Sequence, residues 1–215
     1  MGETRKLSSP YLLAQAGIVR NRASSASEVC AALQRLGEGI AQQIVTDFRL
    51  QSVVVTTPMN EEVEILTIDD RVSVVVTTKP DLKEFGHAIA DVLAPCELGY
   101  MSFQGRRGLD ALTGPVREME LPDLGGEKVS LLVIAKSTLA TGCTAVSLTQ
   151  TAVRQYSPNA VVIASIFHSV RGLQELTREF PGANIYVVGD PDRLGVDGML
   201  YPGVGMLELR MTALE

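Results

Sequence analysis

The sequence predicts an α/β protein in which helices flank a mostly parallel sheet. Two observations support this fold class. Short, β-branched apolar runs alternate along the chain with stretches of helical periodicity. The runs are apolar at nearly every position, which is typical of strands that crossover helices bury on both faces. The predicted strands are Val72–Thr77, Leu98–Phe103, Val129–Ala135, Val161–Phe167 and Ile185–Val188.

The expected helices lie between these runs. Residues 26–47 begin at a Ser27/Glu28 start signal and carry apolar residues at three- and four-residue spacings, which predicts an amphipathic helix. The apolar positions are Val29, Leu33, Leu36, Ile40 and Ile44. Further helices are expected over Asp81–Leu93, over about Thr144–Tyr156, and up to Phe180.

A hairpin is expected between the first helix and the first sheet strand. Gln51–Thr57 and Glu62–Thr67 are β-branched runs separated by the four residues 58–61. The length of 215 residues suits one substantial core, so we expect a single domain over residues 1–215 with a hairpin arm at about 51–67. An exposed arm would suit dimerisation.

The composition narrows the classes of partner. Nineteen basic and 25 acidic side chains give a net charge of -6, which offers no attraction to nucleic acid or anionic lipid. No apolar run approaches the roughly 20 residues of a membrane span, and the start lacks a signal-peptide pattern, so we expect a cytoplasmic protein. Three cysteines and two histidines match no disulfide framework or metal cluster. Reduced thiols, no metal site and no tightly bound cofactor are expected.

The turn after the most apolar strand has the character of a phosphate site. Residues 135–144 leave that strand and enter a helix, and Thr141, Gly142, Cys143 and Thr144 lie at the helix start. Unpaired N–H groups point outward there, the glycine permits close approach, and the threonines add hydroxyl donors. The alternative is a capped helix start without a ligand.

Four stretches resemble the uracil phosphoribosyltransferase family of type I phosphoribosyltransferases over nearly the whole chain. They are residues 10–20, the Pro115-Val116 and Leu121-Pro122 pairs, residues 139–142, and a tail with Arg193-Leu194, Gly198 and residues 202–205. The resemblance implies a parallel sheet, a hairpin arm in a homodimer, and a small C-terminal hood at about residues 190–215. It also implies transfer of a phosphoribosyl group from phosphoribosyl pyrophosphate to uracil, giving UMP and pyrophosphate, with magnesium on the pyrophosphate. The base-binding candidates are Leu200, Gly203 and Gly205.

The main departure from the family pattern is Lys136, which stands where the family has an aspartate that contacts the ribose hydroxyls. An ammonium has no acceptor for those hydroxyls. At about 4 Å it would also repel the positive charge that develops on the ribose, by roughly 4 kcal/mol at an effective dielectric near 20. Two interpretations remain open for Lys136: a solvated lysine at the strand end, or a fixed cation that replaces magnesium beside a phosphate.

Other departures lie at the pyrophosphate and base sites. Lys79 and Pro80 occupy the turn where the family has Arg-Ala-Gly, and Met206 replaces an aspartate of the tail. The family's arginine before the flexible loop is replaced by Ser102, although Arg106 and Arg107 lie close in sequence. With Lys79 they are the pyrophosphate-site candidates, against the alternative that the arginines are a solvated loop pair.

Two side chains near the expected cleft allow further interpretations. Cys143 is either a small buried thiol or a thiol activated by the helix start. His168 is a candidate to line the cleft.

Two functions are consistent with this sequence. We favour a catalytically weak or silent relative that binds a sugar-phosphate or nucleotide, because Lys136, Pro80 and Met206 argue against efficient catalysis. The alternative is an active phosphoribosyltransferase of pyrimidine salvage, because the phosphate loop and the tail glycines are present. Magnesium would be needed only in the active case.

Overall fold

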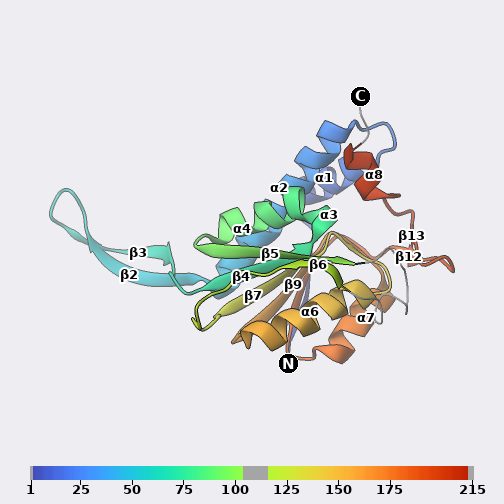
Figure 1. Cartoon of the computed structure of the whole chain (residues 1–215). Coiled ribbons are helices and arrows are strands. Elements are labelled where there is room, and N and C mark those ends of the chain that lie inside the picture. Colours follow the sequence, from blue (N-terminus) through green and yellow to red (C-terminus); the bar gives the residue numbers. More distant parts are fainter. Residues whose placement is uncertain (1, 104–115, 213–215) are drawn as a thin grey trace.

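The computed structural model describes residues 2–103 and 116–212. Within these ranges seven strands form one sheet in the order β1-β11-β9-β7-β4-β5-β6 (Figure 1). All neighbours pair in parallel except β5 and β6, which are antiparallel. The mostly parallel sheet is therefore confirmed. The strands are β1 (Thr4–Leu7), β4 (Ser73–Thr78), β5 (Cys96–Phe103), β6 (Val116–Glu120), β7 (Leu131–Ala135), β9 (Ala160–Ser165) and β11 (Asn184–Val188).

Helices cover both faces of this sheet (Figure 1). On one face lie α1 (Pro10–Arg20), α2 (Ala26–Phe48), α4 (His87–Leu93) and α8 (Leu207–Thr212). The short α3 (Lys79–Asp81) and a π-helical turn, η1 (Leu82–Gly86), lead into α4. On the other face lie α6 (Cys143–Tyr156) and α7 (Val170–Glu179). Each face has its own apolar core. No helix among the described residues is long and apolar enough to cross a membrane.

The longest helix confirms the periodicity argument. All five apolar positions predicted for residues 26–47 are buried in α2. The N-cap is Ser25, not Ser27, because the Ser25 side chain accepts from the Glu28 N–H while the Glu28 carboxylate accepts from the Ser25 N–H. This reciprocal pair satisfies two of the unpaired donors at the helix start.

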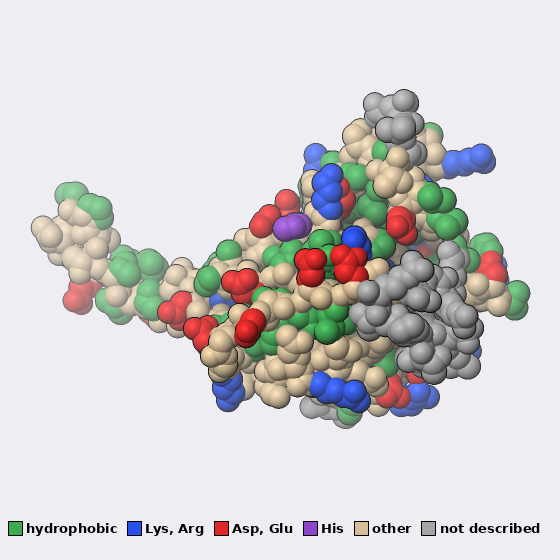
Figure 2. All heavy atoms as spheres, in the orientation of Figure 1, with side chains coloured by type: hydrophobic (Ala, Val, Ile, Leu, Met, Phe, Trp, Pro, Cys, Tyr) green, Lys and Arg blue, Asp and Glu red, His purple; other side chains and the backbone are tan. Residues whose placement is uncertain are grey.

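The predicted hairpin is also confirmed. Its strands β2 (Leu50–Thr56) and β3 (Glu62–Ile68) pair antiparallel and project away from the sheet (Figure 1). Figure 2 shows hydrophobic side chains along this projecting arm. One face of the ribbon carries the cross-strand pairs Val53–Ile65 and Val55–Val63. All four side chains are at least partly exposed.

A buried ion pair holds the base of the arm. Arg49, at the end of α2, is 1% exposed, and its Nε donates to Asp69 Oδ1 at 2.6 Å. The other guanidinium nitrogens donate to Ser73 Oγ, the Leu93 carbonyl and the Asp69 carbonyl. Because every nitrogen of the buried cation has an acceptor, the arm is fixed to the start of β4 and the end of α4.

We expect Asp69→Asn to lower the free energy of unfolding by about 3 to 5 kcal/mol, because it leaves the buried Arg49 charge uncompensated. Urea unfolding followed by circular dichroism measures this change. The control is Asp190→Asn, which breaks the exposed pair with Lys6 and should leave the unfolding midpoint unchanged. Equal effects of the two substitutions would contradict a special role for the buried pair.

Candidate functional site

Two loops meet at the carboxyl edge of the sheet, where ligands of open α/β folds bind. The loop after β7 forms the short strand β8 (Thr138–Leu139), which pairs in parallel with β10 (Phe167–His168). Ser169 extends this contact, since its N–H donates to the Leu139 carbonyl at 3.0 Å and its hydroxyl donates to the Ala140 carbonyl at 2.5 Å. The loop after β7 is therefore held by the segment that enters α7.

Glycines make the close approach of these segments possible. A Cβ added to Gly172 would lie 2.7 Å from the Leu139 carbonyl oxygen, and one added to Gly142 would lie 2.9 Å from the Gly172 oxygen. Gly142 also has φ +84° and precedes α6 as its N-cap, without a side chain to cap the helix. The first N–H groups of α6, those of Cys143, Thr144 and Ala145, have no partner within the helix. A helix start of this kind is suited to an anion, and phosphate binding here stays a prediction.

The carboxylate of Asp81 joins the ends of β4 and β7. Its Oδ2 accepts from Lys136 Nζ at 2.6 Å and from the Thr78 hydroxyl at 2.7 Å, and its Oδ1 accepts from Ser137 Oγ. Burial works to raise the pKa of Asp81, but the Lys136 charge and the three hydrogen bonds outweigh it and hold the pKa below the ordinary value. Asp81 is therefore ionised and paired at neutral pH.

Lys136 is not a solvated lysine at the strand end, which was one of the two interpretations that the sequence left open. Its side chain is 19% exposed and its ammonium is bound to the buried Asp81. The pairing arises because β4 and β7 are neighbours in the sheet, which brings the residues that follow them together. The Lys136 ammonium is therefore held at the loop by Asp81.

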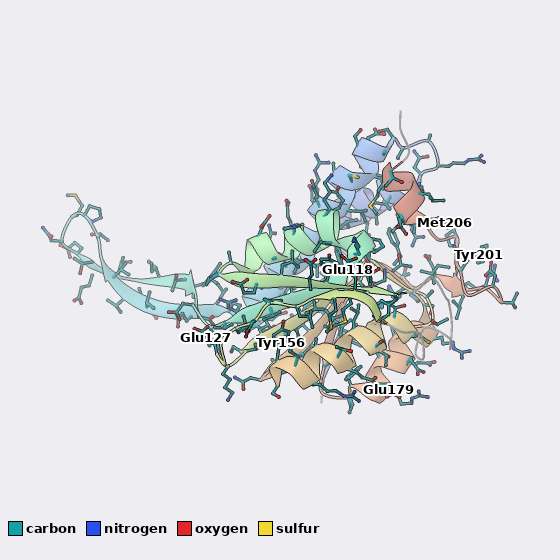
Figure 3. All side chains as sticks on the ribbon, in the orientation of Figure 1. Glu118, Glu127, Tyr156, Glu179, Tyr201 and Met206 are labelled. Atoms are coloured by element: carbon teal, nitrogen blue, oxygen red, sulfur yellow. The ribbon has the colours of Figure 1, made fainter. Side chains whose placement is uncertain are left out.

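The tail is attached to α1 through two arginines. Arg20 donates to both carboxylate oxygens of Asp192 at 2.9 Å and to the Gly203 carbonyl at 3.2 Å. Arg210 of α8 donates to the Val19, Asn21 and Val204 carbonyls. Between these anchors β12 (Arg193–Leu194) and β13 (Leu200–Tyr201) form a small antiparallel pair. Figure 3 shows Met206 where the tail turns back toward α8.

The loop, the ion pair and the tail enclose a cavity of about 290 Å³. Three kinds of group line it: the predicted phosphate loop (residues 139–144), the Asp81–Lys136 pair, and an apolar wall from the tail. The lining residues are Pro80, Asp81, Lys136 to Gly142, Thr144, Ala145, Gly198, Met199, Gly205 to Glu208, and Met211.

Several of the predicted site residues line the cavity. Thr141, Gly142 and Thr144 of the phosphate loop line it, together with Lys136 and, from the tail, Gly205. The Lys79-Pro80 segment is not an open turn, because it forms the start of α3. Pro80 stands in the first helical turn, where its missing N–H costs nothing.

Other predicted residues lie elsewhere in the described structure. Lys79 does not line the cavity, and its ammonium donates to Glu118 on β6 at 2.6 Å (Glu118 is labelled in Figure 3). Leu200 is 7% exposed and packs into the core. The Gly203 carbonyl accepts a hydrogen bond from Arg20, which helps to hold the tail against α1. Arg106 and Arg107 lie outside the described residues.

Cys143 and His168 are buried beside the cavity rather than in it. Cys143 matches the expectation of a small buried thiol. Burial lowers the pKa of His168, and its Nδ1 has no hydrogen-bond partner among the described residues. His168 is therefore a neutral core side chain, and the expectation that it lines the cleft is wrong.

A family model described as uracil phosphoribosyltransferase matches residues 6–207. The chain belongs to this family. Proteins described as uracil phosphoribosyltransferases that are similar to it include one from Pyrobaculum islandicum, 24% identical over 91% of this chain and 90% of the relative. Another, from Thermococcus sibiricus, is 21% identical over 92% and 84% of the two chains.

A solved structure, that of the AQ2163 protein from Aquifex aeolicus, has the same fold. It superposes with a TM-score of 0.79 over 99% of each chain, at 22% sequence identity. The sheet and helices of this member of the uracil phosphoribosyltransferase family therefore have the same arrangement as in that structure.

Sequence reasoning missed two parts of this family member's cavity. Asp81 and Ser137 were not predicted as partners of Lys136, although both follow strands at the carboxyl edge. The apolar wall of Met199, Leu207 and Met211 was also missed. Its signal was weak, because a short helix after a glycine-rich turn has little periodicity to detect.

We expect Gly172→Ala to destabilise the protein by about 1 to 3 kcal/mol, because the methyl group would push the phosphate loop away from α7. Thermal or urea unfolding measures the loss. Gly17→Ala is the matched control: Gly17 is an exposed glycine within α1 with nothing near an added Cβ, so alanine there should stabilise by about 0.5 to 1 kcal/mol. Stabilisation by both substitutions would show that the loop has room to move.

Proposed function

We propose that this member of the uracil phosphoribosyltransferase family binds a nucleoside monophosphate or sugar-phosphate in the cavity and turns over uracil and phosphoribosyl pyrophosphate weakly or not at all. Binding is supported by the uncapped start of α6 and by the threonine hydroxyls that share the cavity with it. The threonines are Thr138, Thr141 and Thr144.

The Asp81–Lys136 pair is the observation that carries the claim of weak turnover. A carboxylate that could accept from ribose hydroxyls is already occupied by an ammonium and two hydroxyls. The ammonium itself cannot accept hydrogen bonds, and it would repel the positive charge that develops on the ribose as the pyrophosphate leaves. The charges of the pocket therefore destabilise the transition state more than they destabilise the bound ligand.

An active phosphoribosyltransferase is the second candidate, and the intact phosphate loop favours it. In that case the Asp81–Lys136 pair would have to separate as substrate binds. UMP formation distinguishes the two candidates.

We expect the wild-type protein to form UMP at least about 100-fold more slowly than the Thermococcus sibiricus relative, which corresponds to about 2.7 kcal/mol of lost transition-state stabilisation. The assay supplies uracil, phosphoribosyl pyrophosphate and magnesium to both proteins and follows UMP. Turnover by the wild-type protein at a rate similar to that of the relative would refute the claim of weak turnover.

We expect the double variant Asp81→Asn/Lys136→Asp to form UMP about tenfold faster than the wild-type protein, because it gives position 136 a carboxylate without a second one beside it. Lys83→Asp is the control, since Lys83 is 89% exposed and lies outside the cavity. An unchanged rate in a folded double variant that still binds UMP would show that Lys136 is not what limits turnover.

We also propose that two copies of the chain associate through the aliphatic face of the arm. Val63 and Ile65 are both 40% exposed and stand beside Val53 and Val55 on one face of the ribbon. A contiguous exposed apolar strip of this kind is characteristic of an interface.

We expect Ile65→Lys to convert a dimer into a monomer in sedimentation-velocity experiments, because it places a charge in the aliphatic face. Val54→Lys is the control: Val54 is 65% exposed on the opposite face and pairs with Glu64, which can accept the new charge. A wild-type protein that sediments as a monomer would refute the proposed dimer.

A further inference from the structure

The cavity offers many donors and few acceptors. Lys136 Nζ has three protons, and its partner among the described residues is Asp81 alone. The α6 N–H groups and three threonine hydroxyls add further donors. The carboxylates that line the cavity are Asp81, which already accepts three hydrogen bonds, and Glu208 on α8. Such a surface suits an anion.

The residues present do not fit the magnesium ion that the family's reaction uses. Magnesium prefers carboxylate oxygens and water in octahedral geometry. The inner carboxylate, Asp81, has an ammonium at 2.6 Å, which a divalent ion would have to displace. No group of three or more His, Cys, Asp or Glu side chains within residues 2–103 and 116–212 could hold a metal ion. The positive charge at this edge of the pocket therefore comes from Lys136.

The pair also changes how the sugar would be recognised. A binding site distinguishes a ribose from a deoxyribose when it has an acceptor that both neighbouring ribose hydroxyls can reach. Asp81 has at most about one of its four acceptor positions left, and Lys136 has none. Removal of the 2′-hydroxyl should therefore cost the ligand little binding free energy.

From these observations, and resting on the proposed function, we propose that the cavity binds a nucleoside monophosphate without a divalent metal, with Lys136 as the counter-charge of the phosphate and with no selection for the 2′-hydroxyl. Asp81 acts as a positioning residue, because its carboxylate holds the ammonium at the loop. The ligand class is thus a phosphate monoester of either a ribonucleoside or a deoxyribonucleoside.

Calorimetric titration of the full chain with UMP and dUMP, each in EDTA and in magnesium chloride at matched ionic strength, tests the proposal. The four dissociation constants should agree within about threefold, a spread well under the tenfold change that 1.4 kcal/mol represents. UMP binding that requires magnesium, or that exceeds dUMP binding by tenfold or more, would overturn the inference and leave the proposed binding function intact. Absence of binding under all four conditions would overturn both.

Variants test the role of Lys136 directly. Lys136→Met should weaken UMP binding by about tenfold or more, the range expected for a charge-assisted hydrogen bond. The double variant Asp81→Asn/Lys136→Met removes both charges together, so it should fold without a lone buried carboxylate and bind UMP as weakly as the single variant. Lys83→Met, which removes an exposed lysine outside the cavity, should bind UMP as the wild-type protein does. Unchanged affinity in a folded Lys136 variant would overturn the inference.

Discussion

The carboxylate of Asp81 is the constraint on which the site depends. It follows β4, yet two of its three donors, Lys136 and Ser137, come from the loop after β7. Two neighbouring strands of the sheet are thereby joined just beyond their carboxyl ends. The phosphate loop begins at this joint, and its other end is held by Ser169 and by the close approach of Gly172. With both ends fixed, the start of α6 lies at the cavity, which Gly142, Thr144 and Ala145 line.

A buried ion pair of this kind is weak evidence for stability, because desolvation of two charges offsets most of their attraction. Its value here lies in what it does to the pocket. The pair keeps Asp81 ionised, since the Lys136 charge opposes the burial that would otherwise raise the pKa of the carboxyl group. It also places one ammonium at the cavity surface in a fixed position. The net effect is a pocket whose inner surface offers hydrogen-bond donors, the Lys136 ammonium among them.

The sheet and the helices could be predicted from the sequence because burial leaves a periodic pattern. Val29 and Ile44 stand at opposite ends of one buried stripe, and the strand at 131–135 is apolar throughout. Elements without such a pattern were missed. The edge strand β1 has the sequence Thr-Arg-Lys-Leu and exists because β11 offers a partner. The phosphate loop was predicted from its glycine and threonines, but the partner of Lys136 was not predicted. Asp81 is 55 residues away, and only the order of strands in the sheet reveals that the two meet.

Binding and turnover make different demands on this pocket, and the sequence changes affect them differently. A fixed cation attracts a phosphate in the bound ligand and in the transition state alike, so it increases affinity without increasing rate. The same cation repels the charge that develops on the ribose, which exists only in the transition state. Replacement of an acceptor by Lys136 therefore separates the two properties: it can preserve affinity for a nucleotide while it raises the barrier to making one. Under the proposed function, the phosphate loop and the altered ribose position are consistent with each other, because the first favours binding of a phosphate monoester and the second opposes its formation.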